Sequence, residues 1–374
     1  MKRAAALRDP EERAPRAPRW TARATQALTD AASQVRVISS NTPTNLREEL
    51  DRLHLSWKTS AELPRFTYAA PPDHTTLRGA LHGLADQLDA LGELGSIYAG
   101  RARELSIEAA LCEHAGGPGL WAAARRRYAL RDTFDASADA TAASWLAESA
   151  PVSAPTETSR SDDELDPTSL VSRLRQELGR RRLPLRVLVS RNLASLAATG
   201  EGFVQIVAER ALTRSDVERT VLHEIEGHVL PRQASITAPI GIFALGTARG
   251  SDDQEGRALA RERAKGFLDH GRRREIALRH QGARSVAAGA DFVATARLLH
   301  DHGAPLADAL RIAARVHRGG GLAREAVYLP ALLRVEAALD VDAGLDSVLG
   351  AGRVSVDSAP ALRAWIARPS PSSA

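Results

Sequence analysis

Residues 223–228 have the sequence His-Glu-Ile-Glu-Gly-His, which places two histidines five positions apart in a segment with helical patterning. On a regular α-helix, residues four apart differ by about 40° in direction, whereas residues five apart differ by about 140°. Two histidines at the longer spacing can share one metal ion only where the helix is locally distorted. The sequence therefore predicts a π-type distortion here, with Gly227 as the most deformable residue and the helix ending close to Pro231.

Histidine and glutamate at this separation can supply two zinc ligands and a general base. We expect His223 and His228 to bind zinc and Glu224 to take a proton from the attacking water. Catalytic zinc usually has three protein ligands, and we select Glu255, near the start of the next long helix, as the third. We expect Glu226 to lie at the surface or to contact one of the ligands from behind. Asp252 and Asp253 are expected to stabilise the N-terminus of the next helix through its dipole.

Composition excludes several classes of protein. The single cysteine, Cys112, rules out an intrachain disulfide framework and a cysteine zinc site, and we expect it to pack in the core. No apolar stretch approaches the roughly 18 residues that span a bilayer, and the N-terminus lacks the apolar centre of a signal peptide. The net charge of +4 is spread thinly without a recognisable nucleic-acid module. We therefore expect a cytoplasmic protein that binds neither nucleic acid nor membrane.

The periodicity of apolar residues predicts a predominantly helical α+β fold with a small sheet next to the H-E-x-x-x-H helix. We interpret this arrangement, together with that motif, as a zincin-like domain. Strands are expected at Leu185, Val187 and Val189 and over Phe203–Val207, and helices after Asp166-Pro167, after Thr213 or Ser215, and after a capping box at 251–254. The predicted division is a disordered tail (1–20), a helical part (21–133), a linker or long surface loop (134–165), a catalytic part (166–368) and a second disordered tail (369–374).

Two motifs carry a resemblance to a known family. The HEIEGH segment, followed by QEGRA at 254–258, resembles the tyrosine carboxypeptidase-type metallopeptidases, which include the microtubule-associated tyrosine carboxypeptidases and bacterial flavohaemoglobin expression-modulating QEGLA-motif proteins. Asn41 to Asn45, Phe66 to Tyr68, and the R-V-x-R-G and Y-L elements at Arg315 and Tyr328 also fit, so the resemblance covers most of residues 21–368. It implies that His223, His228 and Glu255 bind zinc and that Glu224 is the catalytic acid/base.

The chain departs from the family pattern at two positions. Glu226 stands where the family commonly has glycine, and Arg257 replaces the leucine of QEGLA. Neither change removes a ligand or the base, but both alter the charge of the pocket, so substrate preference is not carried over from the family.

A carboxypeptidase must also bind the terminal carboxylate of its substrate, and arginine meets a carboxylate with two hydrogen bonds. Arg318 is the first candidate and Arg315 the second, both just before the turn at Gly319, Gly320 and Gly321. Tyr328 is a candidate donor to the developing oxyanion, with a half-buried core aromatic as its alternative role.

The leading hypothesis is a zinc-dependent metallocarboxypeptidase with one Zn²⁺ per chain, acting on the C-terminal peptide bond of a peptide or protein. The alternatives are a non-enzymatic regulatory or binding protein that retains the fold, and a metallohydrolase of non-peptide amides or esters. The sequence predicts neither the preferred terminal residue nor the oligomeric state.

Overall fold

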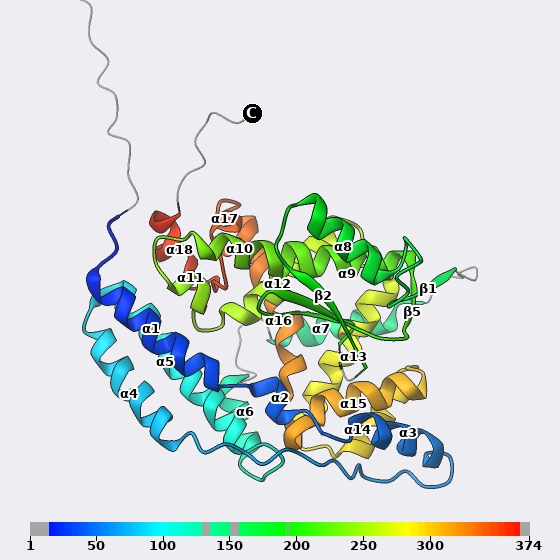
Figure 1. The fold of residues 1–374 in the computed structure, drawn as a ribbon. Helices are drawn as coiled ribbons and strands as arrows, with labels where there is room; N and C mark the ends of the chain where they lie inside the picture. The colour runs from blue at the N-terminus through cyan, green and yellow to red at the C-terminus, as the bar shows by residue number, and fades with distance from the viewer. Residues whose placement is uncertain (1–14, 129–134, 150–156, 192, 194, 367–374) are drawn as a thin grey trace, which may run out of the picture.

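The computed structural model describes residues 15–128, 135–149, 157–191, 193 and 195–366, and these form a mostly helical molecule with two small sheets (Figure 1). The first part is helical, as predicted. Its helices are α1 (Arg19–Gln34), α2 (Val37–Asn41), α3 (Leu46–Ser56), α4 (Thr75–Asp89), α5 (Gly92–Glu113) and α6 (Leu120–Arg127). Cys112 on α5 is fully buried, which confirms its predicted place in the core.

The segment predicted as a linker or long surface loop over 134–165 is partly regular structure, so that prediction is wrong over these residues. Helix α7 (Asp135–Ala147) buries one face, and strand β1 (Thr158–Arg160) pairs with β5 (Ala211–Thr213). The buried residues Ala138, Ala142 and Trp145 recur at helical spacing and pack beside α13 (His270–Ala287) and α16 (Tyr328–Val341). The Ala- and Ser-rich composition hid this apolar face, because alanine buries little surface per residue.

The larger sheet has the order β2-β4-β3, with β2 (Arg186–Ser190) parallel to β4 (Phe203–Val207) and β3 (Ala197–Thr199) antiparallel to it. Both predicted strands are confirmed as β2 and β4, and β3 was not foreseen. One face of the sheet packs on α8 (Leu170–Arg180) and α9 (Arg214–Leu222) through a core that includes Leu174, Val204, Ile206 and Val221. Helix α8 begins after the cap Ser169, three residues later than the expected cap Asp166.

Helix α9 begins at the predicted place, where Thr213 and Asp216 form a capping box. It leads into a π-helix, η1 (His223–Val229), as the histidine spacing predicts. The helix does not end near Pro231, however, and this expectation is wrong. It continues as α10 (Leu230–Ile236), because proline is tolerated at the first turn of a helix that restarts after the π-turn.

Helix α12 (Gly250–Ala264) lies in the middle of the molecule beside α16 and η1 (Figure 1). The predicted capping box is wrong, since α12 begins after Arg249 in a left-handed conformation without a side-chain cap. A Cβ atom on Gly256 would lie 2.4 Å from the Ala331 backbone, and one on Gly227 would lie 2.6 Å from Ala258 Cβ. Two glycines therefore allow α12 to approach α16 and η1 closely.

The remaining elements complete the helical body. They are α11 (Ile242–Leu245), α14 (Phe292–Asp301), α15 (Leu306–Gly321), η2 (Arg324–Val327), α17 (Leu345–Leu349), α18 (Ala359–Leu362) and η3 (Arg363–Trp365). The predicted turn at 319–321 lies at the end of α15, where the three glycines have positive φ. Within the part of the chain that the structure describes, no helix is both long and apolar enough to cross a membrane.

Candidate metal centre

The π-helix brings the two histidines of the motif to the same side. Its backbone hydrogen bonds join residues five apart, which widens the turn so that positions 223 and 228 face one direction. The Nε2 atoms of His223 and His228 are 3.3 Å apart. The spacing that a regular helix cannot use for one ion is therefore accommodated by η1.

Glu255, on α12, supplies the third atom of the cluster. Its Oε2 lies 3.4 Å from His223 Nε2 and 3.7 Å from His228 Nε2. Tetrahedral zinc at about 2.0–2.1 Å from its donors would hold neighbouring donors about 3.3–3.4 Å apart. These separations and the two-nitrogen, one-oxygen donor set fit zinc, with the fourth position left for water or substrate.

A second glutamate on α12 orients His223. Glu262 is fully buried, and its Oε1 lies 2.6 Å from His223 Nδ1. Glu262 is itself held by Arg272, whose Nε and Nη2 donate to its two oxygens at 2.8 and 3.0 Å. A hydrogen bond donated by His223 Nδ1 to Glu262 would leave Nε2, on the Glu255 side, as the nitrogen that can bind a metal ion. On the other histidine, His228 Nδ1 lies 3.2 Å from Gln254 Oε1.

The electrostatics of this cluster favour a cation. Burial lowers the pKa of His223, but the hydrogen bonds with Glu255 and Glu262 outweigh it and raise this pKa to about 10. Burial raises the pKa of Glu262, yet Arg272 and His223 bring it down to about 2. The pKa of Glu255 is likewise lowered, by His228, His223 and Arg324 against burial. Two ionised carboxylates thus converge on the histidine pair, and a proton or metal ion between them offsets the negative charge.

Glu224 is buried beside the sheet. Its Oε2 accepts a hydrogen bond of 2.8 Å from the Thr199 hydroxyl, on the last residue of strand β3. The contact with Thr199 fixes the Glu224 carboxylate against the edge of the sheet. Thr199 thus engages one of the two carboxylate oxygens of Glu224.

Arg324 lies next to the candidate ligand Glu255 and contacts Tyr328. Arg324 Nη2 is 3.4 Å from Glu255 Oε1, and its Nη1 is 3.3 Å from the Tyr328 hydroxyl. Tyr328 is 8% exposed, and the Arg279 guanidinium stacks 4.1 Å from the centre of its ring. The structure therefore brings Tyr328 to the cluster and adds Arg324, which the sequence analysis did not select.

The two arginines proposed for substrate binding lie in a buried cluster around one carboxylate. Glu325 accepts from Arg279 at 2.6 Å and from Arg315 at 3.0 Å, and Arg318 Nη2 lies 3.8 Å away. Burial and the neighbouring Arg315 lower the pKa of Arg318 to about 10. One carboxylate thus faces three guanidinium groups. The positive charge of Arg318 is the least compensated of the three, so the cluster could bind a further anion.

Several acids have roles different from those expected. Asp252 and Asp253 are not merely dipole partners at the start of α12, because each is buried and ion-paired, with Arg127 (2.8 Å) and Arg334 respectively. Glu226, in contrast, agrees with the expected surface position, since its side chain is partly exposed and lies 3.4 Å from Arg181. Thr199, Glu262 and Arg324 also contact the candidate site, and none of them was predicted from the sequence. Only Glu262 carried a usable signal, since it lies two helical turns beyond Glu255 and hence on the same face of α12.

The donor atoms of His223, His228 and Glu255 could hold a metal ion, and the buried carboxylate of Glu224 follows His223 in the chain. The family model described as microtubule-associated tyrosine carboxypeptidase matches residues 56–369, and the chain belongs to that family. This confirms the resemblance seen in the sequence motifs. No curated protein matches the chain.

Proposed function

We propose that the chain is a zinc-dependent metallocarboxypeptidase with a zincin-like centre, which hydrolyses the C-terminal peptide bond of a peptide or protein. Zinc would be held by His223, His228 and Glu255. The observation that supports this most is the convergence of their three donor atoms at 3.3, 3.4 and 3.7 Å. Family membership supports the carboxypeptidase class of reaction.

When bound, zinc supplies a Lewis acid that polarises the scissile carbonyl and makes water more acidic. The attacking water then gives its proton to the Glu224 carboxylate oxygen that Thr199 does not contact. Thr199 holds the other carboxylate oxygen and so fixes the rotamer of Glu224. Glu224 afterwards delivers the proton to the leaving amine. The Tyr328 hydroxyl and the Arg324 guanidinium, which contact each other, would donate to the oxyanion that develops at the carbonyl.

The buried arginine cluster would bind the terminal carboxylate of the substrate. Arg318 is the first candidate, because its guanidinium lies farther from Glu325 than those of Arg279 and Arg315 and so has the least compensated charge. Arg315 already forms a 3.0 Å pair with Glu325, so we assign it a supporting role that holds Arg318 through their shared partner.

Strand β3 is placed to align an extended substrate. It is an edge strand of the β2-β4-β3 sheet, and its last residue contacts Glu224. A peptide added alongside β3 by main-chain hydrogen bonds would run past the general base. This arrangement would present the last peptide bond to Glu224 and the terminal carboxylate to the arginine cluster.

The test compares the wild-type chain with Glu224→Gln on peptides that differ only in carrying a free or an amidated C-terminus. We expect about one zinc per chain in both proteins, release of the last residue only by the wild type, and no release from the amidated peptide. Turnover by Glu224→Gln would refute the proposed base, and cleavage of the amidated peptide would refute the carboxypeptidase assignment. A fully folded wild type without zinc or turnover would instead favour a regulatory or binding protein.

A further inference from the structure

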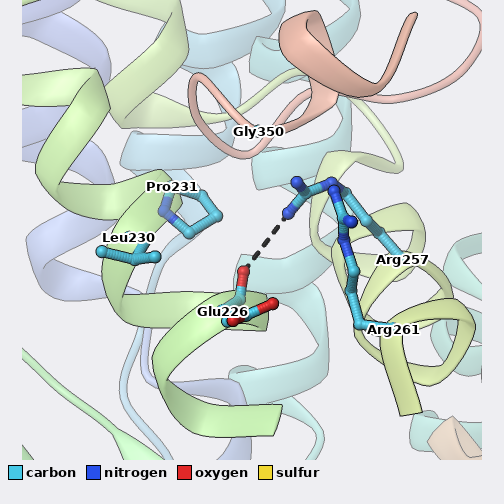
Figure 2. Close-up of a pocket in the computed structure, with 6 residues that line it drawn as sticks. All are labelled: Glu226, Leu230, Pro231, Arg257, Arg261 and Gly350. Carbon is cyan, nitrogen blue, oxygen red and sulfur yellow. Dashed lines mark hydrogen bonds between the residues drawn. The ribbon is translucent and has the colours of Figure 1, made fainter. Parts of the chain in front are cut away.

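Arg257 occupies the position where the family motif has leucine, and it contacts the backbone of the metal-binding π-helix. Its Nη1 donates to the carbonyl oxygen of Glu226 at 3.2 Å (Figure 2). Glu226 lies between His223 and His228, so this hydrogen bond acts on the turn that brings the histidines together. The inference below rests on the proposed metal site and assigns a role to a residue outside it.

The carbonyl of Glu226 needs a donor from outside the helix because of Pro231. In η1 the Leu230 amide donates to the Ile225 carbonyl, five residues back. The next bond of this pattern would join residue 231 to the Glu226 carbonyl, but proline has no amide hydrogen. Figure 2 shows Pro231 above the Glu226 carbonyl and the Arg257 guanidinium approaching it from the side. Arg257 supplies the missing hydrogen bond.

The position of Arg257 is itself fixed. It is 8% exposed, and its Nε donates at 2.9 Å to Asp346 on α17. Arg261, one turn later on α12, pairs with the other oxygen of Asp346. Both arginines line a cavity of about 240 Å³ together with Glu226, Pro231 and Gly350, among other residues. The guanidinium is therefore held between α17 and η1 rather than extending into solvent.

We propose that Arg257 is a positioning residue that keeps residues 223–229 in the π-helical form. Without Arg257, the Glu226 carbonyl would lose the guanidinium as its hydrogen-bond donor. The nearest backbone amide that could donate to it instead is that of Leu230, four residues later. If that amide moves from the Ile225 to the Glu226 carbonyl, the wide turn becomes α-helical. The two histidines would then point about 140° apart and lose their common metal position.

The first measurement is zinc affinity, from competition with a chelator, for the wild type, Arg257→Leu and the control Arg261→Leu. Arg261→Leu removes an ion pair with the same Asp346 but keeps the hydrogen bond from Arg257 to the Glu226 carbonyl. We expect Arg257→Leu to bind zinc roughly ten- to hundredfold more weakly, as for other residues behind metal ligands, and Arg261→Leu to change affinity by less than about threefold. The d–d absorption of the cobalt-substituted protein should change in Arg257→Leu alone.

The second measurement uses Pro231→Ala, which restores an amide hydrogen opposite the Glu226 carbonyl. We expect the double variant Pro231→Ala/Arg257→Leu to recover most of the zinc affinity, even if Arg257→Leu alone folds poorly. Unchanged affinity in a folded Arg257→Leu, an equal loss in Arg261→Leu, or no recovery in the double variant would overturn the role of Arg257. Failure of the wild type to bind zinc would instead overturn the proposed function.

Discussion

The close approach of η1 to α12 leads to a quantitative prediction for Gly227→Ala. The new Cβ would lie 2.6 Å from Ala258 Cβ, whereas carbon atoms in ordinary contact are about 3.5–4.0 Å apart. The two helices must therefore separate by about 1 Å. Because His223 and His228 lie on one helix and Glu255 on the other, the same displacement opens the donor triangle.

Stability and metal binding should respond differently to this change. Overpacking costs about 1–3 kcal/mol, while replacing a helical glycine by alanine returns about 1 kcal/mol, so the net loss of unfolding free energy should be about 0–2 kcal/mol. A misplacement of about 1 Å in an active site can cost about a hundredfold in rate. We therefore expect a modest fall in melting temperature of the metal-free protein and at least a tenfold loss of zinc affinity and of kcat/KM.

The assay combines thermal unfolding of the metal-free chain with chelator competition and peptide hydrolysis. Gly179→Ala on α8 is the control, since no atom lies within 4 Å of its added Cβ, and it should change neither zinc affinity nor rate. Ala258→Gly removes the opposing Cβ and should restore zinc affinity to Gly227→Ala at some cost in helix stability. Wild-type zinc affinity in Gly227→Ala alone would refute the link between helix separation and ligand geometry.

Three further predictions concern single contacts. Thr199→Val removes the hydroxyl that fixes Glu224. Because a hydrogen bond to a charged group contributes about 1.5–3 kcal/mol, kcat should fall about tenfold or more while zinc affinity is unchanged. A wild-type kcat would contradict this. Arg318→Met should raise KM for peptides with a free C-terminus by at least tenfold, and an unchanged KM would remove Arg318 from substrate binding. Burial lowers the pKa of His317 to about 4, below its value of about 6.5 in the unfolded chain, so its contribution to stability is present above pH 6.5 and is lost as pH falls towards 4. The unfolding free energy of the wild type should fall by about 2–3 kcal/mol across this window. The fall should be less steep in His317→Gln and as steep as in the wild type in a variant of the exposed His302. Equal slopes in all three proteins would refute the assignment.

The local features of the site were predictable because they are properties of short segments. The histidine spacing requires a distorted helix, and the capping box at Thr213 marks where that helix starts. For Gly227 the structure adds a packing reason that the sequence does not reveal. Gly227 does not have positive φ, and what needs a residue without a side chain is the approach of Ala258.

The contacts across the site could not be predicted, because they join segments far apart in the sequence. Thr199 meets Glu224 only because the unforeseen strand β3 pairs with β4, and a three-residue strand leaves little periodicity to detect. Arg324 was one of many arginines in the chain, and only folding brings it to Glu255. For α7, the signal was present in the spacing of Ala138, Ala142 and Trp145, but its composition resembles that of a surface loop.

The position of β3 at the edge of the sheet also bears on self-association. The outer main-chain groups of an edge strand can pair with a strand from another molecule as well as with a substrate peptide. Here the open edge is three residues long and is followed by Gly200 and Gly202, which weaken any longer pairing. The opposite edge, β2, has five residues and exposes Leu188 and Val189. If the protein aggregates on partial unfolding, β2 is the strand from which we expect aggregation to begin.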